Sequence, residues 1–156
     1  MPTGLSEEQV GGLLPGTWVL AATNFPQWLG GGNHDTTFTF ELERQHPLVL
    51  RELVQYTTAE NTVRQVVGTD AWHADGFTWR GKGRLRFAPR RWAVAGVSED
   101  STILVLRFSK SRAAQDGLDV LVREDHSYPE LRRVIAHEAE SFGVGSEDFA
   151  SLTWFD

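Results

Sequence analysis

Residues 36–43 read TTFTFELE, and the alternation in this stretch decides the class of fold. Phe38, Phe40 and Leu42 take every second position, with polar Thr39 and Glu41 between them. Successive side chains of a β-strand point to opposite faces, so the pattern predicts a strand with one apolar and one polar face. Such a strand is typical of an antiparallel sheet that buries one side.

Seven further stretches along the chain also predict short strands, each bounded by Gly, Pro, Asn or Asp. They are residues 17–23, 48–57, 63–73, 77–87, 92–97, 102–108 and 118–124. Eight closely spaced strands with hairpin connections predict an up-and-down barrel or a sandwich, and the spacing alone leaves both open. No linker or repeat divides the chain, so residues 1–156 are expected to form a single domain.

The periodicity changes near residue 127. Ser127-Tyr128-Pro129-Glu130 has the spacing of a capping box, and Leu131, Val134, Ile135 and Phe142 follow at helical spacing. One amphipathic helix is therefore predicted over residues 127–142, with its apolar stripe packed on the outside of the sheet. A short final strand is predicted over residues 152–155.

Composition excludes several classes of function. The net charge is −6. The chain has no cysteine, which excludes disulfides, thiolate catalysis and cysteine-bound zinc. No cofactor, metal or nucleic-acid partner is expected. No apolar run approaches the length of a membrane span. Residues 1–16 do not resemble a secretory signal, so the predicted location is the cytoplasm.

One basic stretch stands out against this acidic background. Arg80, Lys82, Arg84 and Arg86 alternate with small or apolar residues. In a strand these cations would share one face, and a solvated face is the favoured interpretation. A site for a phosphate or carboxylate is the alternative.

Several motifs together resemble the lipocalin family over most of the chain. Gly16-Thr17-Trp18, at the start of the first predicted strand, looks like the Gly-x-Trp signature of lipocalins. Ser98-Glu99-Asp100 falls at their conserved turn between the sixth and seventh strands, with only the central acid in common. Arg123 falls where the family has an Arg before its helix. The predicted helix and Leu152-Thr153-Trp154 are similar to the C-terminal layout of bacterial lipocalins.

The resemblance implies an all-β fold, an eight-stranded antiparallel up-and-down barrel with one C-terminal α-helix packed outside. It also implies that Trp18 closes one end of the barrel and that Arg123 stacks over its ring. A ligand would then lie inside the barrel. The predicted ligand-binding residues face inward or lie on a lid: Leu20, Trp28, Phe38, Phe40, Trp72, Trp79, Leu104 and Leu106. Ala22 and Leu42 are expected to face inward as well, and the long loop 24–34 is expected to act as the lid.

Three functions remain open from the sequence. Binding or transport of a small apolar molecule, fatty-acid-like or polycyclic, is favoured over catalysis. The alternative is an isomerase or cyclase that uses the same cavity, with an acid or base among His34, Asp35, Glu52, Tyr56 and His73. An interaction module with a filled barrel is the third. A titratable group at the centre of the barrel would favour the enzyme, and the oligomeric state stays open.

Overall fold

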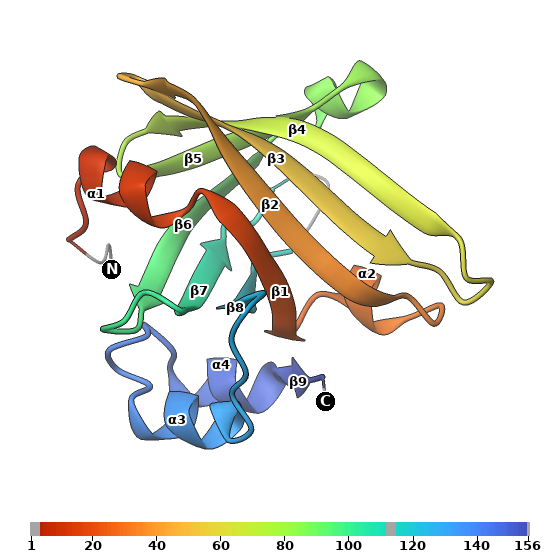
Figure 1. The fold of residues 1–156 in the computed structure, drawn as a ribbon, viewed down its shortest axis with the longest axis vertical. Helices are drawn as coiled ribbons and strands as arrows, with labels where there is room; N and C mark the ends of the chain where they lie inside the picture. Colours follow the sequence, from red (N-terminus) through yellow and green to blue (C-terminus); the bar gives the residue numbers. More distant parts are fainter. Residues whose placement is uncertain (1–3, 112–114, 156) are drawn as a thin grey trace.

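The computed structural model describes residues 4–111 and 115–155. Its main strands run antiparallel in chain order: β1 (Gly16–Thr23), β2 (His34–Gln45), β3 (Leu48–Thr57), β4 (Val63–His73), β5 (Gly76–Gly81), β6 (Arg90–Val97), β7 (Ile103–Phe108) and β8 (Gly117–Arg123). Because β1 pairs with both β2 and β8, these strands form a closed barrel (Figure 1). The predicted eight-stranded up-and-down barrel is confirmed.

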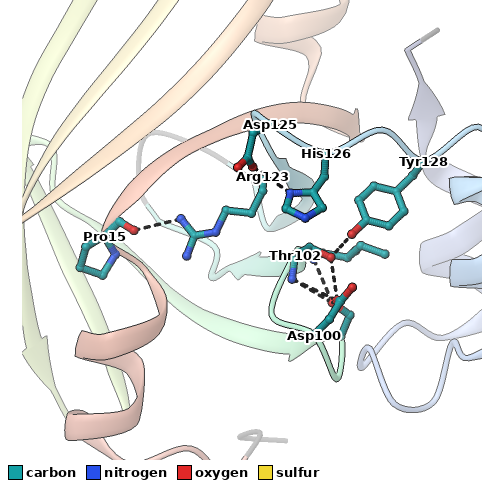
Figure 2. A network of polar contacts seen from close by, with 9 residues as sticks. Pro15, Asp100, Thr102, Arg123, Asp125, His126 and Tyr128 are labelled. Atoms are coloured by element: carbon teal, nitrogen blue, oxygen red, sulfur yellow. Dashed lines mark hydrogen bonds and ion pairs between the residues drawn. The ribbon is translucent and has the colours of Figure 1, made fainter.

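Trp18 and α1 (Glu7–Leu13) close one end of the barrel. The Trp18 side chain is fully buried, and its Nε1 donates to the carbonyl oxygen of Leu14 at 3.0 Å. The guanidinium of Arg123 lies 3.9 Å from the centre of the Trp18 ring. It also donates to the carbonyl oxygen of Pro15 at 2.9 Å (Figure 2). The plug that the lipocalin resemblance implied is therefore present.

The turn between β6 and β7 is fixed by Asp100. Its carboxylate accepts hydrogen bonds from the hydroxyl of Ser98 and from the hydroxyl of Thr102 (Figure 2). The Thr102 hydroxyl also contacts the hydroxyl of Tyr128, in the segment that leads from β8 to the helices. The expected lipocalin-like turn thus ties the barrel to the C-terminal segment.

Two short helices, α3 (Leu131–His137) and α4 (Ser146–Ser151), pack outside the barrel (Figure 1). They cover the outer faces of β7 and β8 through a second apolar cluster that includes Val105, Val120 and Ile135. These strands are buried on both faces, which explains their nearly continuous apolar sequences. The short strand β9 (Thr153–Trp154) then pairs with Ala22 and Thr23 of β1.

The predicted single helix over residues 127–142 is wrong in its bounds. After His137 the chain turns toward the barrel, where the backbone of Phe142 packs against Gly96. A Cβ atom at Gly96 would lie 2.4 Å from the Cα of Phe142. This close approach favours a turn that ends at Gly143, whose φ is +67°, over a longer helix. The sequence analysis also missed α4.

The predicted fifth strand, residues 77–87, is too long. β5 ends at Gly81, and a 3₁₀-helix, η1 (Gly83–Phe87), follows. Gly83 has a φ of +60°, and the side chain of Leu85 folds back over Gly81. Lys82, Arg84 and Arg86 are exposed around this turn instead of lining one strand face.

Two inward assignments are also wrong. A bulge in β1 between Leu20 and Ala22 reverses the alternation, so Ala22 packs in the outer cluster. Leu42, beside a bulge in β2, is 42% exposed. None of the helices in the described part of the chain has the length and apolar character needed to cross a membrane.

We expect Trp18→Ala to lower the free energy of unfolding by about 3–5 kcal/mol, because it removes a large buried ring. Arg123→Ala should cost about 1–2 kcal/mol through the lost stacking and hydrogen bonds. Urea denaturation followed by circular dichroism measures both. Phe155→Ala, which truncates an aromatic ring that is 41% exposed, is the control. An unchanged midpoint for Trp18→Ala would contradict the structural role given to the plug.

Candidate functional site

A cavity of about 330 Å³ lies inside the barrel. Its apolar wall comes from β2 to β7, from the loop after β1 and from η1: Phe25, Trp28, Phe38, Val54, Val66, Trp79, Leu85, Trp92 and Phe108. Gln27, Glu52, Arg90 and Asp119 supply its polar groups. The volume falls in the range of small-molecule sites, which are mostly apolar with a few placed polar groups.

Carboxyl groups from three strands gather inside the barrel. Glu52 of β3 and Asp119 of β8 line the cavity, while Asp70 of β4 lies beside Glu52. Their exposed fractions are 8%, 1% and 0%. Burial of this kind disfavours the charged form, so each pKa rises.

Glu52 and Asp70 form a tightly interacting pair. Burial and the neighbouring negative charge of Asp70 raise the pKa of Glu52 well above its usual range. Burial raises the pKa of Asp70 from 3.8 to about 6, against the opposing effect of hydrogen bonds from Glu52 and Trp92. Trp92 Nε1 donates to Oδ1 of Asp70 at 2.8 Å, whereas Oδ2 lacks an N–H or hydroxyl donor among the described residues. A proton on Glu52 supplies one, so the pair is expected to hold a shared proton at neutral pH.

Asp119 interrupts the run of apolar residues in β8 that extends from Leu118 to Val122. The hydroxyl of Thr23 donates to its Oδ1 at 2.7 Å. Burial nevertheless raises the pKa of Asp119 from 3.8 to about 7, because the hydrogen bond and the charge of Arg90 compensate only in part. Arg90 lies over the rings of Phe25 and Phe108, each 5.6 Å from the guanidinium, and it donates to the carbonyl oxygen of Gln115.

Two segments border the cavity away from the Trp18 plug. α2 (Pro26–Leu29) lies in the predicted lid loop and places Trp28 edge-on against Phe38 and Tyr56, at ring distances of 6.2 and 5.7 Å. Leu85 of η1 contributes from the opposite side. Trp28 is half-buried, so the loop presents an aromatic cover to the cavity. Its role as a lid stays a prediction.

All eight predicted ligand-binding residues belong to the inner apolar cluster, but they divide into two groups. Trp28, Phe38 and Trp79 line the cavity. The others pack around it without lining it: Leu20, Phe40, Trp72, Leu104 and Leu106. Whether any of them binds a ligand stays a prediction.

Among the candidate acids and bases, only Glu52 lines the cavity. Tyr56 contacts Trp28, and His34, Asp35 and His73 are exposed. The sequence analysis missed Asp70 and Asp119 altogether. Asp70 shares the alternation that turns Trp72 inward, and Asp119 interrupts the apolar run of residues 118–122. In the described residues no cluster of metal-ligating side chains is placed to hold an ion.

The buried acids give stability an unusual dependence on pH. At pH 5 the folded protein retains protons on Asp70 and Asp119 that the unfolded chain has lost, so these groups stabilise the fold. That contribution is lost as pH rises through their folded pKa values of about 6 and about 7. We expect the free energy of unfolding to fall by on the order of 3 kcal/mol between pH 5 and pH 8.

Urea unfolding at a series of pH values in this window tests the expectation. Asp119→Asn should flatten the profile, because the amide keeps an acceptor for Thr23 and does not titrate. Glu60→Gln, in an exposed turn, is the matched control and should leave the slope unchanged. If the free energy of unfolding of the wild-type protein stays level or rises with pH, ionisation of these carboxyls does not destabilise the fold and the expectation is wrong.

Solved structures with the same barrel are numerous, although no protein-family model matches the sequence and no curated protein is significantly similar to it. Lobster apocrustacyanin A1 gives a TM-score of 0.65 at 6% identity, covering 92% of this chain and 77% of its own. The bovine lipocalin allergen Bos d 2 gives 0.61 at 12% identity over 92% and 93%. The siderocalin Ex-FABP gives 0.62 at 12% identity over 96% and 94%. The chain therefore has the lipocalin fold.

Proposed function

We propose that this protein binds a small, largely apolar molecule inside the barrel, and that transport of this molecule in the cytoplasm is its role. The observation that carries the proposal is the cavity of about 330 Å³, which has aromatic walls and the Trp18 plug at one end. The third function considered from the sequence, an interaction module, calls for a barrel filled by its own side chains. The presence of a cavity argues against the interaction module.

The solved structures with this fold support a binding role in general terms. One of them, the siderocalin Ex-FABP, functions through dual ligand specificities. For the present chain, the wall chemistry itself is the stronger argument. At about 25 cal/mol per Å², burying ~300 Å² of apolar ligand surface contributes about 7 kcal/mol before ordering costs. Affinities near the micromolar range are therefore expected.

The neutral dye N-phenyl-1-naphthylamine should bind in the cavity with a Kd in the micromolar range and a rise in its fluorescence. Trp28→Ala should weaken binding about tenfold, because it removes a half-buried aromatic wall without opening the core. A fluorescence titration measures both. Phe155→Ala is the matched control and should bind the dye like the wild type. Absence of dye binding, or equal loss in both variants, would contradict the proposal.

Catalysis is the second candidate, and the buried carboxyls favour it specifically. Glu52 faces the cavity and is expected to be protonated, while Asp119 has a pKa of about 7, close to the working pH of a general acid or base. An isomerase or cyclase could use one group as acid and the other as base.

Native mass spectrometry of the protein purified from its own host separates the two candidates. The bound molecule is extracted, identified and incubated with fresh protein. Recovery of the unchanged molecule indicates a carrier. Conversion to a new product that Glu52→Gln abolishes indicates an enzyme, and conversion that survives both Glu52→Gln and Asp119→Asn would remove the carboxyls from that mechanism.

A further inference from the structure

The cavity holds more buried acid than its cations balance. Glu52, Asp70 and Asp119 converge from three different strands, and each is more than nine-tenths buried. In the described part of the chain, Arg90 is the one cation on the cavity wall, and its charge only partly offsets the effect of burial on the pKa of Asp119. Its guanidinium donates to the carbonyl oxygen of Gln115 and lies over the rings of Phe25 and Phe108.

Ordinary folding does not call for this arrangement. Buried carboxyls are unfavourable unless they are paired or fully hydrogen-bonded, and leucine or valine at these positions would pack an apolar core. Oδ2 of Asp70 is buried, and in the described part of the chain no N–H or hydroxyl group donates to it, so the carboxyl of Glu52 is the partner left for Asp70 on this side. Glu52, next to it, lines the cavity. With one shared proton, the Glu52–Asp70 pair keeps one negative charge beside a space enclosed by aromatic rings.

We propose that the cavity takes an organic cation, a small amine with an aromatic or compact apolar body, whose ammonium group lies at Glu52 and whose body lies against Trp28, Phe38 and Trp79. This inference rests on the proposed binding function and names the chemical class of the ligand. An ammonium group brings up to three hydrogen-bond donors, which the carboxylate oxygens can accept once their shared proton is released. Aromatic faces attract cations as well, so wall and acids act together.

The same geometry ranks other ligands below amines. A carboxylate ligand would meet the negative charge that the Glu52–Asp70 pair retains beside its shared proton, and like charges in a site of low dielectric repel strongly. A neutral alcohol keeps the apolar contacts and can hydrogen-bond to Glu52, but it gains no charge attraction. We therefore expect the order of affinity to be amine, then alcohol, then carboxylate.

Amine binding should also release protons. Facing Glu52 are Asp70 from β4, Asp119 from β8 and, farther off, Arg90 from β6; the inward residues of β2 beside it, Phe38 and Phe40, are uncharged. Burial raises the pKa of Glu52 and of Asp119, and a bound cation would favour their ionised forms. Affinity for the amine should therefore increase between pH 5 and pH 8, while affinity for the alcohol should change little.

The experiment compares three ligands that share one ring system and a two-carbon arm: 2-(1-naphthyl)ethylamine, 2-(1-naphthyl)ethanol and 1-naphthylacetate. Isothermal titration calorimetry at pH 7.5 should show the amine binding at least tenfold more tightly than the alcohol, with the carboxylate weakest. Repeating the amine titration in phosphate and in Tris should give different heats, which reports the released proton.

Variants assign the effect to the buried acids. Glu52→Gln should reduce amine affinity tenfold or more and leave alcohol affinity within threefold, so the alcohol also shows that the cavity is intact. Glu43→Gln, an exposed acid on β2, is the matched control and should change neither. If Glu52→Gln loses the alcohol too, Asp119→Asn provides the same comparison.

The outcomes separate the inference from the function on which it rests. Equal binding of amine and alcohol by the wild-type protein, or tightest binding of the carboxylate, would overturn the inference and leave the binding function standing. Failure of all three ligands and of N-phenyl-1-naphthylamine would overturn the binding function itself. An amine preference that persists unchanged in both acid variants would place the cation elsewhere and overturn the assignment to Glu52.

Discussion

The double pairing of β1 is the constraint on which the rest of the structure depends. β1 pairs with β2 through Gly16 to Val19 and with β8 through Trp18 to Thr23, so its hydrogen bonds convert an open sheet into a barrel. Trp18 can close the end only because this pairing holds it under Arg123. The cavity, its aromatic walls and the relative positions of the three acids all follow from closure.

The bulge in β1 links closure to the packing of the C-terminal helices. Before the bulge, Trp18 and Leu20 face the inner cluster; after it, Ala22 faces the outer one. This small residue lies beneath the segment that carries Leu152. Beyond the residues of β1 that pair with β2, β9 pairs with Ala22 and Thr23. One inserted residue therefore gives β1 a role in both cores.

Much of this architecture could be predicted from the sequence because it rests on local periodicity. The alternation of Phe38 and Phe40 and the turn at Asp75-Gly76 need only neighbouring residues. The errors arise where distant contacts override local preference. The predicted helix stops short of Phe142, whose backbone instead approaches Gly96 closely. The predicted fifth strand ends at Gly81, where Leu85 folds back onto it. The bulge in β1 leaves no mark in its sequence.

The candidate site follows the same division. Trp28, Phe38 and Trp79 were found because large apolar residues on inward or lid positions are expected at a ligand site. Glu52 was only one of several candidate acids and bases, since the sequence does not show which of them is buried. Asp70 and Asp119 were missed because each is a single acid in its own strand, and the sequence does not show that the folded barrel brings them together. Three acids from β3, β4 and β8 become a cluster only when the barrel has closed.

The order of the strands also has a consequence for the nascent chain. β1 leaves the ribosome early, yet one of its two partners, β8, lies about a hundred residues later, so the barrel cannot close until most of the chain has been synthesised. β7 and β8, which are buried on both faces, are the last strands of the barrel to emerge, and α3 and α4, which cover them, follow. Until then these strands are exposed to other chains. The segment after Arg123, which carries α3 and α4, therefore covers these strands only after it has itself been synthesised.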